Sequence, residues 1–88
     1  MTREDILKEI MERDMFDKDE YVILADGFEP AFVGVSVNKP SRVIYDYWLC
    51  LDTIIKRDKA DFDDAQDWLD EFIAEELGEH SPIYIKQI

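Results

Sequence analysis

The chain has 88 residues, with 22 acidic side chains against 10 basic ones, so its formal net charge is −12. A chain of this length forms one small domain. Its hydrophobic content of 47% can fill a core, which excludes intrinsic disorder. So few cations among so many anions exclude a basic surface for duplex DNA or anionic lipid, and any electrostatic partner should be positively charged.

The sequence contains no segment typical of export or of a membrane span. Its amino-terminal residues are charged every few positions, unlike a secretory signal. The longest apolar runs, such as residues 21–25, are far shorter than the ~20 residues that a membrane helix needs. A single cysteine, Cys50, cannot form an internal disulfide. We therefore expect a cytoplasmic protein.

The first half of the chain predicts one helix and three strands. Apolar residues at helical spacing indicate a helix over about residues 3–13, capped by Thr2. The strands are short apolar runs between turn residues, and Gly34 marks a bulge or a close approach in the second one. They cover residues 21–25, 31–37 and 42–45. Their short connections favour an antiparallel meander.

The second half predicts two helices and a closing strand. One helix begins at the cap Asp46 and ends near residue 57, and the next begins at the cap Asp61 and ends near residue 77. Residues 83–88 read as the last strand. The order α-β-β-β-α-α-β predicts a single α+β domain, with an antiparallel sheet of about four strands and three helices on one face.

The third predicted helix has an unusual charge pattern, because residues 61–79 hold nine carboxylates and no lysine or arginine. On a helical wheel, six of them fill the arc opposite the apolar residues. These six are the predicted partner-binding residues: Asp63, Asp64, Asp67, Asp70, Glu71 and Glu75. Carboxylates along this helix recur every ~3 Å, close to the ~3.4 Å between phosphates on one DNA strand. The pattern favours a surface that imitates nucleic acid or fits a basic groove, with a merely solubilising face as the alternative.

Two acidic clusters offer oxygen ligands for a metal ion. They are residues 61–64 and 17–20. Neither has the alternating oxygen ligands, central glycine and terminal glutamate of a calcium loop. We therefore expect neither a metal nor a cofactor.

Few residues could support catalysis. Cys50 lies on the apolar arc of its helix, which favours a buried structural thiol, and His80 lies in a turn, which favours a surface or loop-bracing residue. Asp26 and Asp46 could in principle pair as acid and base, but their turn and capping positions already explain them. We expect no catalytic residue.

Three large apolar side chains remain on the second and third helices. Trp48 and Trp68 lie on apolar arcs and are expected in the core. Leu49 falls outside its arc, so it is either covered by the third helix or exposed.

Three motifs stand out along the chain: DGFEPAFVG at residues 26–34, VIYDYWLC at 43–50 and GEHSP at 78–82. Together they resemble a family of small uncharacterised bacteriophage and prophage proteins with the patterns DGFxxAFxG, VYDYxxC and GEx(S/T)P. The resemblance covers roughly residues 22–85. It implies a phage gene product that acts in a bacterial cytoplasm, and it carries over no activity and no functional residues.

The leading hypothesis is a non-enzymatic phage protein that binds and inhibits a basic, nucleic-acid-binding host protein through helix 61–77, in the manner of anti-defence, anti-CRISPR-like nucleic-acid mimics. The alternative is a phage structural or housekeeping module that binds partners through an apolar patch near Leu49 and Phe28. A third hypothesis is a small enzyme or metal-dependent factor that uses Asp26 and Asp46.

Overall fold

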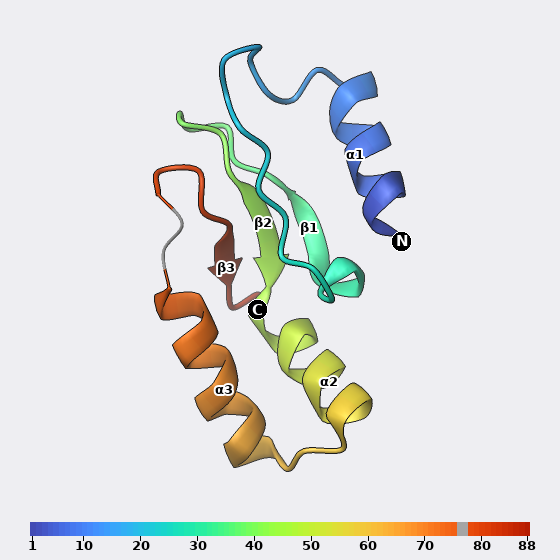
Figure 1. Ribbon diagram of the computed structural model, residues 1–88, viewed down its shortest axis with the longest axis vertical. Coiled ribbons are helices and arrows are strands. Elements are labelled where there is room, and N and C mark those ends of the chain that lie inside the picture. The colour runs from blue at the N-terminus through green and yellow to red at the C-terminus, as the bar shows by residue number, and fades with distance from the viewer. Residues whose placement is uncertain (76–77) are drawn as a thin grey trace.

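The computed structural model describes residues 1–75 and 78–88, and within them the chain is an α+β domain (Figure 1). It contains three α-helices, one 3-10 turn and a mixed sheet of three strands. In chain order the elements are α1 (Arg3–Glu12), η1 (Glu29–Ala31), β1 (Phe32–Val35), β2 (Val43–Asp46), α2 (Tyr47–Asp58), α3 (Phe62–Ala74) and β3 (Ile83–Ile85).

The predicted helix caps are confirmed. The side chains of Thr2, Asp46 and Asp61 each accept a hydrogen bond from the backbone N–H three residues on, at 2.9 to 3.2 Å. The helices α1 and α2 end within a residue of their predicted ends. The third predicted helix was extended too far, because α3 ends at Ala74. Glu76 and Leu77, the predicted end, lie outside the described residues.

The sheet has the order β1-β2-β3, with β1 antiparallel and β3 parallel to β2. The register of β1 shifts between Phe32 and Gly34, which confirms the predicted irregularity at Gly34. The prediction of a wholly antiparallel sheet is wrong for β3. Because α2 and α3 lie between β2 and β3, they form the long crossover connection that a parallel pair requires.

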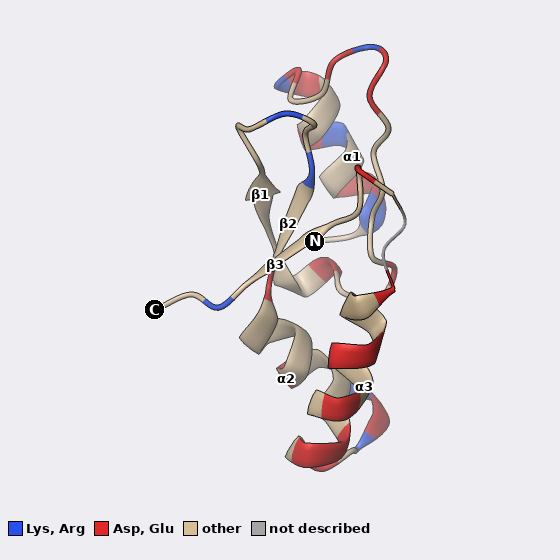
Figure 2. Cartoon of the chain, turned by 90° about the vertical axis from the view of Figure 1, so that its left-hand side faces the viewer, with Lys and Arg blue, Asp and Glu red and all other residues tan. Residues whose placement is uncertain are grey.

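Residues 21–25, predicted as a strand, pair with no strand in the described chain. In Figures 1 and 2 this segment crosses over one face of the sheet. Val22 and Leu24 pack against the core, and the Ala25 N–H donates to the Tyr45 hydroxyl at 2.9 Å. The prediction of a buried strand is therefore correct only in part: Ala25 is buried and residues 22–24 are half-buried, but Tyr21 is 72% exposed. The segment pairs with no strand, which leaves three strands instead of four.

The core lies between the inner face of the sheet, α1, the turn after residue 25, and the paired helices α2 and α3. Side chains with under 2% exposure come from all of these elements. They include Ile6, Phe28, Ala31, Val43, Tyr45, Cys50, Ala65 and Leu69. The helical hairpin of α2 and α3 projects beyond the sheet (Figure 1), so the molecule is elongated, 41 by 24 by 23 Å.

Candidate functional site: the acidic face of α3

The six carboxylates predicted to bind a partner all lie exposed on α3 or at its C-terminal cap. We call this surface the acidic face: Asp63, Asp64, Asp67, Asp70, Glu71 and Glu75. The helix buries Ala65 and Leu69 toward the core, which turns the opposite side to solvent. Figure 2 shows the acids as successive bands along α3.

The acidic face lacks counter-charges. Among residues 1–75 and 78–88, every ion pair joins residues outside this face. On α2, by contrast, Lys56 Nζ lies 2.9 Å from Asp52 Oδ2, and at the C-terminal cap of α1 Arg13 Nε lies 2.9 Å from Glu9 Oε2. The other two helices thus balance acids with cations one turn away, whereas α3 does not.

Asp67 lies at the centre of the acidic face. It has a carboxylate three or four residues away on either side: Asp63, Asp64, Asp70 and Glu71. Each such like-charge pair destabilises a helix by roughly 0.2–0.5 kcal/mol. Repulsion within the acidic face therefore lowers the stability of α3.

Asp70 has a structural role in addition to its charge. The Tyr47 hydroxyl donates a 2.7 Å hydrogen bond to Asp70 Oδ1, which joins α3 to the first turn of α2. Burial, followed by this bond to the carboxylate, raises the pKa of Tyr47. No local pattern in the sequence indicated the contact, because its partners are 23 residues apart.

Two aromatic side chains of α3 are half-exposed, Phe62 at 51% and Trp68 at 47%. The Trp68 ring stacks on Phe72 with centroids 5.3 Å apart and planes at 11°, and it approaches Phe28 at 6.4 Å. The expectation of a core Trp68 is therefore wrong in part: a wide ring stacked on one neighbour still leaves much of its surface in solvent. α3 presents aromatic surface beside its carboxylates.

The first turn of α2 also exposes apolar surface. Trp48, expected in the core, is 44% exposed, and Leu49 is 46% exposed, which settles its two alternatives in favour of solvent. The Trp48 ring packs edge-on against Tyr47 at 5.2 Å and lies 5.4 Å from Lys86 Nζ. Phe28 is only 1% exposed, so the patch that was expected to join it with Leu49 does not form.

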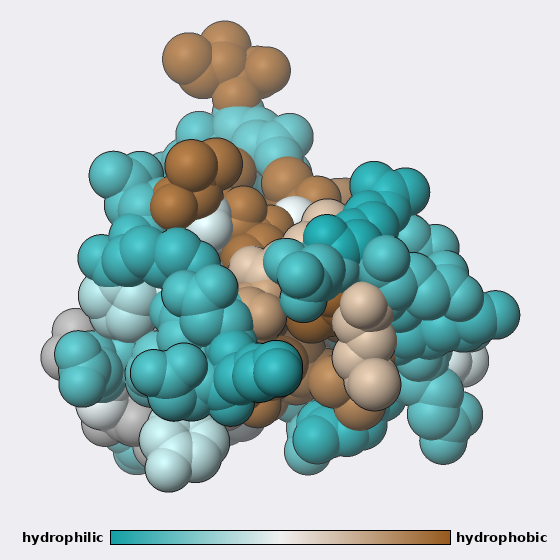
Figure 3. Space-filling view, turned by 90° about the horizontal axis from the view of Figure 1, so that it is seen from above, coloured by the Kyte–Doolittle hydropathy of each residue, from teal (hydrophilic) through white to brown (hydrophobic). Residues whose placement is uncertain are grey.

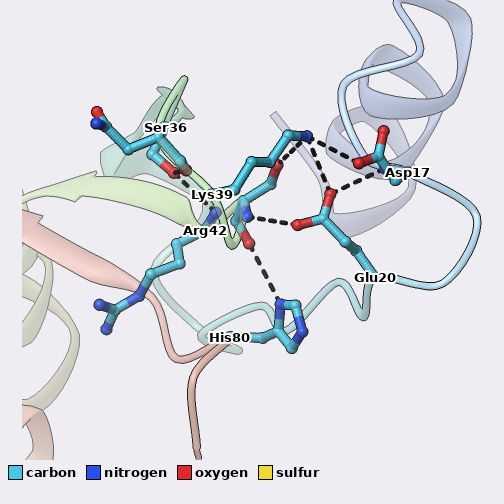
Figure 4. A network of polar contacts seen from close by, with 8 residues as sticks. Asp17, Glu20, Ser36, Lys39, Arg42 and His80 are labelled. Carbon is cyan, nitrogen blue, oxygen red and sulfur yellow. Dashed lines mark hydrogen bonds and ion pairs between the residues drawn. The ribbon is translucent and has the colours of Figure 1, made fainter.

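The next two residues considered for catalysis, Cys50 and His80, are held by packing and by loop contacts. Cys50 is fully buried, and burial raises the pKa of its thiol to about 12, so the reactive thiolate is disfavoured. His80 is half-buried, with Nδ1 3.5 Å from the Ser41 carbonyl oxygen and its ring edge-on to Tyr21 at 5.8 Å. This arrangement agrees with the loop-bracing interpretation (Figure 4).

Asp26 and Asp46 have separate partners. The exposed Asp26 forms an ion pair with Arg3, and Asp46 is 8% exposed and caps α2. The turn position predicted for Asp26 and the capping position predicted for Asp46 are confirmed.

Glu20 is the centre of a polar network near the hairpin of residues 36–42 (Figure 4). It accepts hydrogen bonds from the Ser41 N–H at 2.6 Å, the Asp17 N–H at 3.0 Å and Lys39 Nζ at 3.2 Å. The two backbone donors and then Lys39 lower the pKa of Glu20 to about 2. Because these groups bond one another, the network braces the loop against the hairpin.

Within the part of the chain that the structure describes, no group of three or more His, Cys, Asp and Glu side chains could hold a metal ion. The described helices include none whose length and apolar character would let it cross a membrane. No protein-family model, curated protein or solved structure matches the chain.

Proposed function

We propose that this chain is a non-enzymatic binding protein whose acidic face occupies a basic groove on a nucleic-acid-binding protein and competes there with nucleic acid. The supporting observation is the set of six exposed carboxylates on α3 and at its C-terminal cap, none of them in an ion pair within the described residues. Along the helix they recur at one charge per ~3 Å, near the phosphate spacing of one DNA strand.

The geometry suits association with a cationic surface. Uncompensated carboxylates attract a basic partner over about a Debye length and speed the encounter. Phe62 and Trp68 add exposed aromatic surface on the same helix, the kind of side chain that dominates interface energies. Charge would speed association and make it depend on salt, and the aromatic rings would make short-range contacts with the partner.

The setting of this activity follows from the resemblance to phage and prophage proteins. A phage protein of this kind would act in the host cytoplasm on an enzyme that holds nucleic acid in a basic groove, such as a CRISPR effector, a restriction enzyme or a polymerase factor. This step rests on analogy with other small acidic phage proteins. The proposal predicts that the chain inhibits its target by occupying the groove and does not modify it chemically.

Reversing charge on the acidic face tests the proposal. The triple variant Asp63→Lys, Asp67→Lys, Glu71→Lys spares Asp70 and its bond to Tyr47. A matched control changes exposed acids elsewhere: Glu4→Lys, Glu12→Lys and Asp19→Lys. Each reversal adds two units of charge, so both variants carry −6 instead of −12. Any difference between them therefore reports position, not net charge.

The measurement is capture of heparin-binding proteins from a bacterial lysate on immobilised chain, at about 0.1 M and about 0.5 M salt. We expect the wild type and the control to retain a partner at low salt and release it at high salt, and the acidic-face variant to retain none. Equal capture by both triple variants would contradict the proposal.

The alternative function, an interaction module that binds through apolar surface, is favoured by the exposure of Trp48 and Leu49. It predicts that capture is insensitive to salt and is lost in Leu49→Asp. The same experiment thus separates the two functions.

A further inference from the structure

A hollow of about 280 Å³ opens beside the C-terminal end of α3. Three segments far apart in the sequence line it: residues 24–26, the last turn of α3 with its cap, and residues 81–84, which lead into β3. In Figure 1, β3 lies between the end of α3 and residues 24–26. The apolar walls are half-buried side chains: Leu24, Phe72, Ile73, Pro82 and Tyr84. We call this hollow the α3 pocket.

The charged side chains that line the α3 pocket are carboxylates. They are Asp26 and Glu75, and both are exposed. Asp26 forms an ion pair with Arg3, whereas Glu75 has no ion pair within the described residues. No lysine or arginine is among the described residues that line the pocket. The carboxylate of Glu75 is therefore open to a cation from outside the chain.

The end of α3 adds partial negative charge. The last carbonyl groups of a helix lack partners within it, and the helix dipole favours a cation beside them. α2 has Lys56 and Arg57 in its last turn, whereas α3 has no basic residue there. The α3 pocket thus combines apolar walls with uncompensated negative charge, which favours a cation carried on an apolar stem.

A second apolar hollow has the opposite charge. Figure 3 shows apolar side chains gathered at the end of the molecule that carries the hairpin of residues 36–42. Met15, Val35 and Val37 line a hollow there, but the charged residue in its described lining is Lys39. Of these two hollows, the α3 pocket is the one that suits a positively charged group.

The size and the walls of the α3 pocket favour a single arginine side chain. Sites for whole small molecules are typically about 300–1,000 Å³, so a hollow of about 280 Å³ suits one long side chain. Arginine packs its methylene stem on apolar surface, stacks its guanidinium on aromatic rings and bonds a carboxylate with two N–H groups. Phe72 and Tyr84 offer the rings, and Glu75 offers the carboxylate.

We propose that the α3 pocket binds an arginine side chain of the protein partner. This inference rests on the proposed function and names the group on the partner that the chain recognises, because arginine is the residue typical of phosphate and nucleic-acid recognition. Glu75 belongs both to the acidic face and to the pocket, so the two surfaces are continuous. Arginine is also among the residues that dominate interface energies when they fill a pocket.

Titration of the ¹⁵N-labelled full chain with the peptide acetyl-Gly-Arg-Gly-amide, followed by NMR, tests the pocket. Peptide concentrations up to about 50 mM cover dissociation constants in the millimolar range. We expect the backbone amide signals of residues 24–26, 72–75 and 83–84 to shift. The same peptide with citrulline in place of arginine keeps the shape without the charge, and it should bind about tenfold more weakly or not at all.

Variants on one helix separate the pocket from the rest of the acidic face. Glu75→Gln removes the carboxylate that lines the α3 pocket, and the matched control Asp63→Asn removes one exposed carboxylate at the other end of α3. We expect Glu75→Gln to raise the dissociation constant of the arginine peptide about fivefold or more and Asp63→Asn to raise it about twofold or less. The amide spectrum itself establishes that each variant is folded.

Signal changes spread along the whole acidic face, or equal weakening by Glu75→Gln and Asp63→Asn, would overturn the inference, because general attraction to negative charge would then explain the binding. Absence of peptide binding at about 50 mM would overturn it as well. The peptide assay uses no partner protein. Peptide binding without capture from a lysate would therefore contradict the proposed function alone, and capture without peptide binding would contradict the α3 pocket alone.

Discussion

At the scale of single residues, one acidic-face residue, Asp70, also holds the fold through its bond to Tyr47, whereas the polar network around Glu20 lies outside the surface proposed to bind. Glu20 has a side chain only 11% exposed and accepts bonds from two backbone N–H groups and from Lys39. Its pKa falls from 4.5 to about 2 because all three donors favour the charged form. A depressed pKa in the folded state means that the stabilisation is complete above pH 4.5 and is lost as the pH falls toward 2.

Glu20→Gln should therefore lower the thermal unfolding midpoint at pH 7, and its deficit relative to wild type should shrink as the pH falls from about 4.5 toward 2. Thermal unfolding followed by circular dichroism at several pH values measures this. The control Asp19→Asn, exposed in the same loop, should leave the midpoint near that of the wild type. A Glu20→Gln deficit as large at pH 2 as at pH 7 would show that the carboxylate charge is not what stabilises the network.

Residue-level predictions from the sequence succeeded where the chemistry is local. Thr2, Asp46 and Asp61 cap their helices because a capping side chain bonds a backbone group three residues away. The prediction that both tryptophans lie in the core failed, since a helical wheel gives the direction of a side chain but not how far its ring reaches past its neighbours. The bond between Tyr47 and Asp70 depends on how two helices pack, which no local pattern contains.

At the scale of elements, α3 combines a good cap with poor charge pairing. Asp61 caps the helix by accepting a hydrogen bond from the Asp64 N–H, while Asp67 has acidic neighbours on both sides. On α2 the corresponding acid, Asp52, forms an ion pair with Lys56. The change of Asp to Asn can therefore be compared at two sites: Asp67, among like charges, and Asp52, beside an opposite charge.

Asp67→Asn should raise the free energy of unfolding by about 1 kcal/mol at low salt, because it removes four repulsive pairs of roughly 0.2–0.5 kcal/mol each. Urea denaturation measures this, and the gain should shrink as salt screens the charges. The control Asp52→Asn breaks an attractive pair and should lower stability slightly, by about 0.5 kcal/mol or less. Destabilisation by both variants would contradict the repulsive character of the acidic face.

Elements were predictable where one segment carries its own pattern. Helices with a cap and a period of 3.6 were placed with their correct first residues, and the acidic arc of α3 is exposed as predicted. Residues 21–25 failed as a strand because burial and strand pairing give the same apolar run. The parallel direction of β3 was missed because the path of the chain after α3 is set by packing.

At the scale of the whole molecule, acidity and apolar surface are segregated. Residues 61–88 hold nine acids and one base, so two-thirds of the net charge lies in the last third of the chain, chiefly on α3. The strands, by contrast, contain no exposed carboxylate. Binding by the acidic face should therefore weaken as salt screens its charges.

The most direct measurement of the central claim is competition with nucleic acid. A labelled DNA duplex is bound to the protein that the wild-type chain captures, and the anisotropy of the label is followed as the chain is added. If the acidic face occupies the nucleic-acid groove, the wild type and the Glu4, Glu12, Asp19 control release the duplex, and the Asp63, Asp67, Glu71 variant does not. A ternary complex, in which the duplex stays bound while the chain binds, would contradict the account.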